Sequence, residues 1–382
     1  MKLSIVIPTK DRYKYLLPLL ELLDGYKLMN TEVIVEDNSK DNFEYVKYMQ
    51  DHHLEIPVRY YHNPYSLPIS KNIDNAINHS SGDYVCVIGD DDAVTPLIED
   101  FVKWMEDNDV DSVRQKKEIT YKWPTYKDDE GNYLGAVLSY GIISDKSYII
   151  DTKIAVKNVV ERGLMSMRDV PCVYQGIVKR DTLNKLYNIG NTYFPGPSPD
   201  MANAVALAFV VNNHHVTDMP IIVSGGSEYQ GGRSEKIKTW VQPLENIPFI
   251  SDAAKSKWDK RIPYYWSGYT VWPESAIKGL EYVGKEKMLQ DMDFELLLAK
   301  CMYESFESRK YILSRTKKTF RVWLLFVKFY IRENLAKVKR SYMRKLNIAE
   351  SGTNRMTGIM TIDAAVKFLM SEYGKIVDKK NI

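Results

Sequence analysis

Residues 84–92 read Tyr84-Val85-Cys86-Val87-Ile88-Gly89-Asp90-Asp91-Asp92, an apolar run followed by one glycine and three consecutive carboxylates. The run is short, aromatic and β-branched, which is typical of a strand buried on both faces of a parallel sheet. In such sheets ligands bind beyond the carboxyl ends of the strands, where Asp90, Asp91 and Asp92 fall. Adjacent carboxylates repel each other and favour a counter-charge, and oxygen ligands suit Mg²⁺ or Mn²⁺. A solvated acidic turn is the alternative that the triplet alone leaves open.

The segments before the triplet predict a doubly wound α/β sheet. Strand patterns that alternate with helical patterns occupy residues 3–7, 13–23, 32–36, 42–52, 58–61, 69–78 and 84–88, in the order β-α-β-α-β-α-β. Polar residues follow these strands, so we expect them to converge at one edge of the sheet. The chain has no GxGxxG after the first strand and no GxxxxGK[ST] motif. A Rossmann dehydrogenase or a P-loop NTPase is therefore not expected.

The rest of the chain is less regular. Residues 112–148 show no clear period, whereas strands are predicted at 173–179 and 216–223, and an apolar helix at 201–211. Asp181 is a plausible N-cap of a further helix. A glycine-rich segment follows at 224–234, and the chain reads as helical beyond residue 240. We therefore expect an α/β domain at 1–235 and a mainly helical region at 236–382.

Composition indicates a reduced intracellular protein. The 382 residues are 45% hydrophobic, which is ample for a core, and the three cysteines form no CxxC pair. Neither a zinc knuckle nor a disulfide framework is expected. The chain opens with a strand pattern rather than a signal peptide, and no apolar run approaches the roughly 20 residues that span a bilayer. We expect a cytoplasmic location, with the inner face of the cell membrane as a second site.

Charge is concentrated near the C-terminus. Residues 309–345 contain 13 Lys and Arg but one acidic residue, Glu333, whereas the whole chain has a net charge of only +2. Aromatic and aliphatic residues are interspersed among the cations, which favours peripheral contact with an anionic membrane. A surface for homo-oligomerisation and a packed core helix are the alternatives. No recognised nucleic-acid module accompanies the run, so no nucleic-acid partner is expected.

Four N-terminal blocks, taken in order, resemble the family 2 glycosyltransferases. The blocks are 4–12 (SIVIPTKDR), 33–39 (VIVEDNS), 70–72 (SKN) and 82–92 (GDYVCVIGDDD). Residues 173–200 resemble the acceptor half of the same domain, so the resemblance covers about residues 1–235. It implies the GT-A fold and an inverting transfer of a sugar from a nucleotide diphosphate, most often UDP.

The resemblance also implies the residues that bind the donor. The residues implied are Pro8, Thr9, Asp11 and Arg12 around the nucleoside, Asp37 at the uracil edge with Asn38 beside it, and Lys71 near the phosphates. We also expect the glycine-rich segment at 225–234 to fold over the donor as a mobile lid, which would bring Arg233 and Ser234 to the pyrophosphate. Lys71 stands where the family often has an Arg-Asn pair, and it supplies a point charge without the planar fork of arginine. The alternatives are an ordinary Asx turn at 37–39 and a plain surface loop at 225–234.

The acidic triplet corresponds to the metal motif of the family, which is commonly Asp-x-Asp-Asp. Here the first acid is replaced by Gly89. The resemblance places Asp91 and Asp92 near a Mn²⁺ or Mg²⁺ ion and Asp90 toward the ribose. The metal would act as a Lewis acid on the departing pyrophosphate.

Asp200 is the candidate catalytic base by the same resemblance. An inverting transfer is a single in-line displacement, and one carboxylate must take the proton of the acceptor hydroxyl. The alternative is that Asp200 only caps the helix predicted at 201–211.

These expectations together describe a hexosyl- or N-acetylhexosaminyltransferase that uses a UDP-sugar. Its acceptor would be a hydroxyl of a glycan or lipid-linked glycan in bacterial surface polysaccharide synthesis, for a capsule, O-antigen or teichoic-acid-like polymer. One alternative is a non-catalytic member that binds a nucleotide sugar or a glycan. Another is a nucleotidyltransferase, which would need a basic, glycine-rich phosphate loop after the first strand; residues 8–11 are not one.

Overall fold

The computed structural model describes residues 2–127, 133–228, 241–247, 250–345 and 352–378. The strands are β1 (Leu3–Thr9), β2 (Thr31–Asp37), β3 (Val58–His62), β4 (Tyr84–Val87), β5 (Ala93–Val94), β6 (Ser112–Gln115), β7 (Thr120–Lys122), β8 (Val137–Tyr140), β9 (Ser147–Ile150), β10 (Gly176–Lys179), β11 (His214–Thr217), β12 (Ile222–Gly226) and β13 (Asn354–Thr357). The helices are α1 (Tyr13–Gly25), α2 (Phe43–Asp51), α3 (Ile69–His79), α4 (Ile98–Asp107), α5 (Thr152–Glu161), α6 (Arg180–Gly190), α7 (Pro199–Leu207), α8 (Asp252–Ser256), α9 (Gly268–Tyr282), α10 (Phe294–Glu304), α11 (Arg309–Leu313), α12 (Thr319–Lys345) and α13 (Ile362–Asp378).

The larger sheet is mixed, as expected for the GT-A fold. Its order is β3-β2-β1-β4-β10-β6-β11-β9. β3, β2, β1 and β4 are parallel, whereas β10 runs antiparallel to both β4 and β6. In the register of β1 with β2, Thr9 lies opposite Asp37, so the polar loops after these strands begin side by side. The predicted convergence of loops at one sheet edge is confirmed for these two strands.

A smaller sheet lies beside the first, in the order β13-β8-β7-β12-β5. β5 directly follows the acidic triplet and pairs with β12, so the triplet is the turn between the two sheets. The expectation of irregular structure over residues 112–148 is wrong, because β6, β7, β8 and β9 all lie there. These strands are only three or four residues long and carry Lys, Arg, Gln and Ser, so they show little alternation. The single strand predicted at 216–223 is two strands, β11 and β12.

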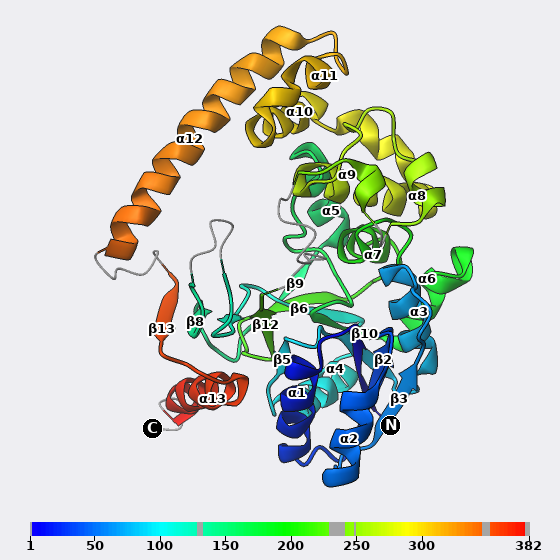
Figure 1. Ribbon diagram of the computed structural model, residues 1–382, viewed down its shortest axis with the longest axis vertical. Coiled ribbons are helices and arrows are strands. Elements are labelled where there is room, and N and C mark those ends of the chain that lie inside the picture. The colour runs from blue at the N-terminus through cyan, green and yellow to red at the C-terminus, as the bar shows by residue number, and fades with distance from the viewer. Residues whose placement is uncertain (1, 128–132, 229–240, 248–249, 346–351, 379–382) are drawn as a thin grey trace.

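The two parts predicted on either side of residues 235 and 236 pack together in two places. α5 and α7 share one hydrophobic core with α9, α10 and α12, and they gather with these helices at one end of the molecule (Figure 1). At the C-terminus the chain returns to the α/β part: β13 pairs with β8, and α13 places Ile362, Val366 and Leu369 in the core beneath α1 and β1. The expectation of helix throughout the C-terminal region is therefore wrong at β13.

The N-termini of α6 and α7 differ from those predicted. α6 begins at Arg180 with Lys179 at its N-cap, so Asp181 lies in the first turn and is not the cap. α7 begins at Pro199, two residues before the predicted start, with Ser198 at its N-cap. Proline suits the first helical position because its missing N–H has no partner there. No helix within the described residues is both long enough and apolar enough to cross a bilayer.

Candidate functional site

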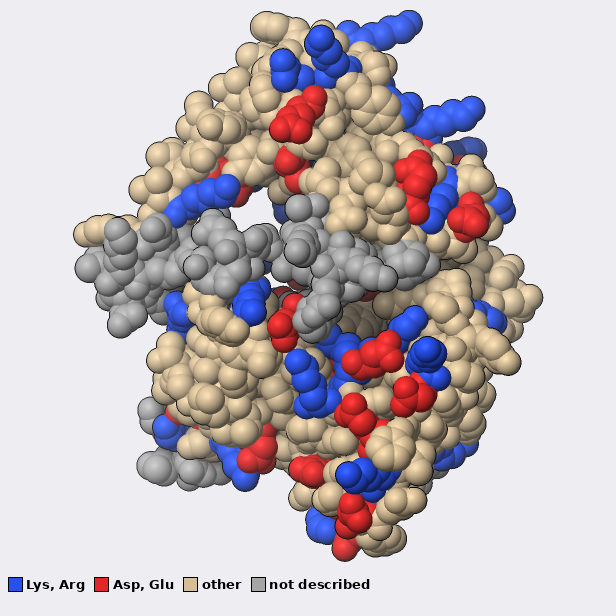
Figure 2. Space-filling view, viewed as in Figure 1, with Lys and Arg blue, Asp and Glu red and all other residues tan. Residues whose placement is uncertain are grey.

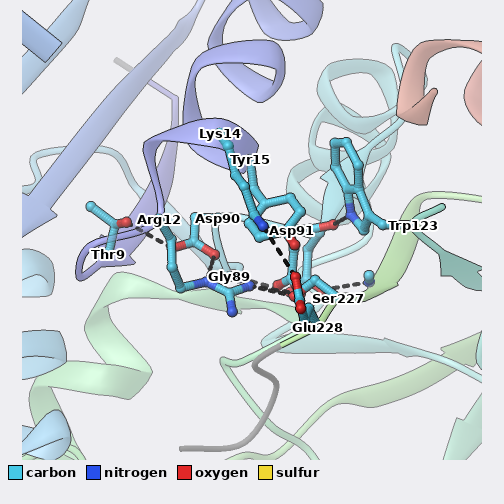
Figure 3. A network of polar contacts seen from close by, with 12 residues as sticks. Thr9, Arg12, Lys14, Tyr15, Gly89, Asp90, Asp91, Trp123, Ser227 and Glu228 are labelled. Atoms are coloured by element: carbon cyan, nitrogen blue, oxygen red, sulfur yellow. Dashed lines mark hydrogen bonds and ion pairs between the residues drawn. The ribbon is translucent and has the colours of Figure 1, made fainter. Parts of the chain in front are cut away.

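The loop after β1 supplies a counter-charge to the acidic triplet (Figure 3). Arg12 Nε donates to Asp90 Oδ1 at 2.7 Å, and Arg12 Nη2 lies 2.8 Å from Asp91 Oδ2. Thr9 Oγ1 donates to the other oxygen of Asp90, also at 2.7 Å. A guanidinium stays charged and can bridge two carboxylates with its planar fork. A residue 78 positions earlier in the chain thus provides the cation that the triplet requires.

Burial shapes the charge of this cluster. Asp90, Asp91 and Asp92 are each less than a tenth exposed. Burial raises the pKa of Asp90, and the charge of Arg12 opposes that shift. Burial also raises the pKa of Asp92, and the negative charge of Asp91 adds to the shift. A further cation at this edge would oppose these shifts and favour the charged form of the carboxylates.

Asp92 holds the turn together. Its Oδ1 accepts a hydrogen bond from the backbone N–H of Gly225 at 2.7 Å, and its Oδ2 accepts one from the N–H of Gly89 at 2.7 Å. Gln175 Nε2 lies 3.0 Å from both oxygens. Every oxygen of this carboxylate has protein donors, which argues against the predicted metal contact of Asp92. Its observed contacts instead tie the triplet to β12 and to the segment before β10.

Asp91 uses only one of its two carboxylate oxygens in contacts with the described residues. Its Oδ2 accepts from Ser227 Oγ at 2.5 Å and faces Arg12, while its backbone oxygen accepts from Trp123 Nε1 at 2.8 Å. Within the part of the chain that the structure describes, Asp91 Oδ1 accepts no hydrogen bond. Of the three carboxylates, Asp91 is therefore the one best placed to take a new ligand.

Two glycines fit the triplet closely. A Cβ at Gly89 would lie 3.1 Å from Asp91 Oδ1 and 3.1 Å from the hydroxyl of Tyr174. An aspartate at this position, as is common in the family, would crowd both groups. A Cβ at Gly225 would lie 1.8 Å from the backbone oxygen of Asp91, so β12 can reach the triplet only through a glycine.

The hydroxyl of Tyr174 lies beside the triplet, since a Cβ added at Gly89 would be 3.1 Å from it. Burial raises the pKa of this phenol well above its ordinary value, and the charges of Asp92, Asp91, Asp200 and Asp90 raise it further. The side chain of Tyr174 is half-buried next to the triplet. The next residue, Gln175, has a left-handed backbone with φ of 53°, which is uncommon outside glycine. This local strain turns the Gln175 side chain onto Asp92.

Asp200 is half-buried in the first turn of α7. Ser198 occupies the N-cap, so the alternative that Asp200 merely caps this helix is wrong. Ser198 Oγ donates a short hydrogen bond to Asp200 Oδ1. Asp200 Oδ2 accepts none from the described residues. The carboxylate is thus oriented on one side and open on the other.

Hydrogen bonds connect the predicted nucleoside-binding residues Asp11 and Asp37 through Ser39. Asp37 is fully buried, and its oxygens accept hydrogen bonds from Tyr13 and Tyr60 hydroxyls at 2.5 Å and from the N–H of Ser39 at 2.8 Å. Ser39 Oγ in turn accepts from the N–H of Asp11, whose φ is 55°. Asp37 could contact a base only if one of these donors released it. In this arrangement it fixes the shape of the loop.

Other predicted donor residues lie around the same edge. Pro8 is half-buried in β1 opposite Glu36. The Asn38 amide donates to the backbone oxygens of Asn63 and Tyr65, at 2.8 and 2.6 Å, and shapes the loop after β3. Lys71 is exposed in the first turn of α3, and its charge acts on the buried Asp74. Arg233 and Ser234 lie outside the described residues, so their predicted contact with the pyrophosphate stays a prediction.

Trp123, Tyr174, Gln175 and Ser227 complete the site, although no role was predicted for them. Each approaches the triplet from an element distant in sequence. No local pattern distinguishes these residues. The expectation of a mobile glycine-rich loop is wrong at Gly225 and Gly226, which belong to strand β12.

Comparisons with known proteins bear on this site. Residues 4–140 match the family model described as glycosyl transferase family 2, which confirms the resemblance over the segment that carries Arg12 and the triplet. No curated protein sequence matches the chain significantly. Among solved structures, TarS 1–349 from S. aureus in complex with UDP-GlcNAc is 15% identical, with a TM-score of 0.49, over 86% of this chain and 79% of that one. The mannosyltransferase PcManGT from Pyrobaculum calidifontis, in complex with GDP-Man and Mn²⁺, is 14% identical, with a TM-score of 0.39, over 86% of each chain.

Proposed function

We propose, on the premise that residues 4–140 belong to glycosyltransferase family 2, that this chain transfers a sugar from a UDP-sugar to an acceptor hydroxyl with inversion. The observation that carries the proposal is a set of four carboxylates: the buried triplet at the turn between the two sheets, which pairs with Arg12, and Asp200, which accepts a hydrogen bond from Ser198. Three of them come from one turn and the fourth from a separate helix. This separation suits one face for the donor phosphates and another for the acceptor.

Asp200 acts as the base in this proposal. Its open oxygen takes the proton of the acceptor hydroxyl as that hydroxyl oxygen bonds to the anomeric carbon. The bond between this carbon and the diphosphate oxygen breaks at the same time, and UDP leaves with the electron pair. The hydrogen bond from Ser198 fixes the direction of the carboxylate. No second carboxylate acid is needed, because the diphosphate is a good leaving group.

A divalent cation fits the site through Asp91, with Asp90 beside it. Asp91 Oδ1 has no protein donor within the described residues, and Mg²⁺ typically uses one or two carboxylates while keeping several waters. The described residues contain no group of three acidic, His or Cys side chains that could form a complete cage, which suits such a partly hydrated ion. When bound, the cation would neutralise charge on the departing pyrophosphate. In this proposal Asp92 does not contact the ion; its hydrogen bonds to Gly89, Gly225 and Gln175 hold the turn that carries Asp91.

Arg12 has two tasks in this proposal. Without a donor it neutralises Asp90 and Asp91, which would otherwise repel each other. It also stands beside the carboxylate that we assign to the ribose, in the loop where the family binds its nucleoside. Its contacts would rearrange when a cation takes over the charge of Asp91.

The acceptor is proposed on the resemblance alone. We expect a glycan or lipid-linked glycan of a bacterial surface polysaccharide, and transfer of a hexose or an N-acetylhexosamine. Screening UDP-sugars against such acceptors tests this part separately from the donor site.

Isothermal titration with UDP, with and without Mn²⁺, tests the donor site. We expect metal-dependent binding to the wild type and its loss in Asp91→Asn. Asp107→Asn is the matched control, because Asp107 is exposed at the end of α4. If UDP bound to neither protein under either condition, the UDP-dependent proposal would be wrong, and GDP and CDP would be titrated next.

A further inference from the structure

α12 packs on the protein through one face only. Val322 and Phe329 are buried, and Leu325 and Phe326 pack against the same helical core. The helix runs along the outside of the molecule (Figure 1). Its contacts with the body are made mainly to α10. A helix of 27 residues is about 40 Å long, so much of its surface faces away from the protein.

The opposite face of α12 carries an exposed apolar stripe. It consists of Phe320, Leu324, Val327, Ile331, Leu335, Val338 and Tyr342. Their exposed fractions range from 48% for Val327 to 76% for Phe320. The spacing of three or four residues keeps them in line, and at 3.6 residues per turn this line lies about 180° from Val322 and Phe329. The surface over α12 is mostly uncharged in the space-filling view (Figure 2).

A row of cations flanks this apolar stripe. Arg321, Lys328, Arg332 and Lys339 recur at intervals of seven, four and seven residues, which places them along one side of it. Arg321 pairs with Asp293 and Glu295, and Arg332 pairs with Glu333. Lys328 and Lys339 are exposed. The apolar stripe and the cation row together form a surface that is apolar at its centre and positive along one flank.

We propose that this surface of α12 docks onto an anionic lipid bilayer, with the apolar stripe in the interface and the cation row at the head groups. A helix with this division of residues lies in the plane of a membrane surface. Exposed lysines beside it attract anionic lipid. The alternative occupant is α12 of a second copy. That arrangement is disfavoured, because residues 309–345 carry 13 cationic residues and a single acidic one, so two copies would bring like charges together.

α12 shares a hydrophobic core with α7, the helix that carries the candidate base Asp200. Met201 and Ala204 of α7 lie in the hydrophobic cluster that contains Val322 of α12. α7 and α9 pack closely, as do α10 and α12. Bilayer contact through α12 would therefore set the position of α7 relative to the membrane.

Flotation of the full chain with lipid vesicles tests the proposal. We expect the wild type to float with vesicles of phosphatidylcholine and phosphatidylglycerol in equal parts, and much less with phosphatidylcholine alone. Leu324→Glu/Ile331→Glu should reduce the floated fraction at least tenfold. Ile154→Glu, on the exposed face of α5, is the matched control and should float like the wild type. Lys328→Glu/Lys339→Glu should weaken flotation, and the wild type should lose binding as salt increases.

The far-ultraviolet circular dichroism and the thermal unfolding of each variant show whether it is folded. Failure of the folded wild type to float with either vesicle would overturn the proposal, as would equal flotation of Leu324→Glu/Ile331→Glu. A wild-type dimer in the absence of lipid that Leu324→Glu/Ile331→Glu converts to a monomer would assign the apolar stripe to a second copy instead. None of these outcomes depends on whether the donor is a UDP-sugar.

Discussion

Asp91 and Asp92 are adjacent carboxylates, yet we expect opposite results when each is changed to asparagine. In Asp92→Asn one oxygen becomes an amide N–H₂ group. It must face the N–H of Gly89 or that of Gly225, since these two donors occupy different oxygens. A buried donor left without an acceptor costs about 1–3 kcal/mol. Relief of the repulsion from Asp91 offsets part of this cost, so we expect a net loss of about 1–2 kcal/mol.

Asp91→Asn should leave stability nearly unchanged. Its remaining oxygen can accept from Ser227 and Arg12, while the amide group takes the place of Oδ1, which has no donor within the described residues. Loss of the ion pair with Arg12 costs stability, whereas relief of the repulsion from Asp90 and Asp92 offsets that cost, so we expect a net change of less than about 1 kcal/mol. The same variant should lose metal-dependent binding of UDP.

Urea denaturation followed by circular dichroism measures the first effect, and titration of UDP with Mn²⁺ measures the second. Asp107→Asn serves as the control for both. If Asp92→Asn were as stable as the wild type while Asp91→Asn unfolded readily, the assignment of Asp92 as the structural carboxylate would be wrong. If only Asp92→Asn lost the Mn²⁺-dependent binding of UDP and remained folded, Asp92 rather than Asp91 would be the metal ligand.

Three further changes test other parts of the structure. Asp200→Asn should lower the rate of transfer by about 10²–10⁴-fold while the Kd for UDP stays the same, and an unchanged rate in a UDP-release assay would remove Asp200 as the base. Gly225→Ala would place a Cβ 1.8 Å from the backbone oxygen of Asp91, so we expect a loss of about 3 kcal/mol or more in urea denaturation. Gly374→Ala, which meets nothing within 4 Å, should show no such loss. Burial raises the pKa of Glu274 from 4.5 to about 7, so the protonated side chain stabilises the fold at low pH, and this contribution is lost as the pH rises through 7. Glu274→Gln should therefore be more stable than the wild type at pH 8, by up to about 3 kcal/mol, and similar at pH 4; the same difference at both pH values would contradict this account.

The first four strands and the helices between them could be predicted because their signals are local. β1, β2, β3 and β4 each coincide with an apolar run, and each run ends at a polar loop. The period of apolar residues depends on neighbours along the chain, so it is visible without the fold. The order of these elements also placed the triplet at the carboxyl edge of the sheet. The short strands β6 to β9 gave no such signal and were not predicted.

The residues that could do chemistry were recognisable from the sequence: a triplet of carboxylates after a buried strand, Arg12 after another strand, and Asp200 near the start of a predicted helix. Their separate roles depend on contacts that form only in the folded chain. Arg12 pairs with Asp90 and Asp91, the donors Gly89, Gly225 and Gln175 occupy the oxygens of Asp92, and Ser198 orients Asp200. These partners come from segments far apart in the chain. A local pattern records the period of a strand, but strand order and register decide which side chains meet across a sheet edge.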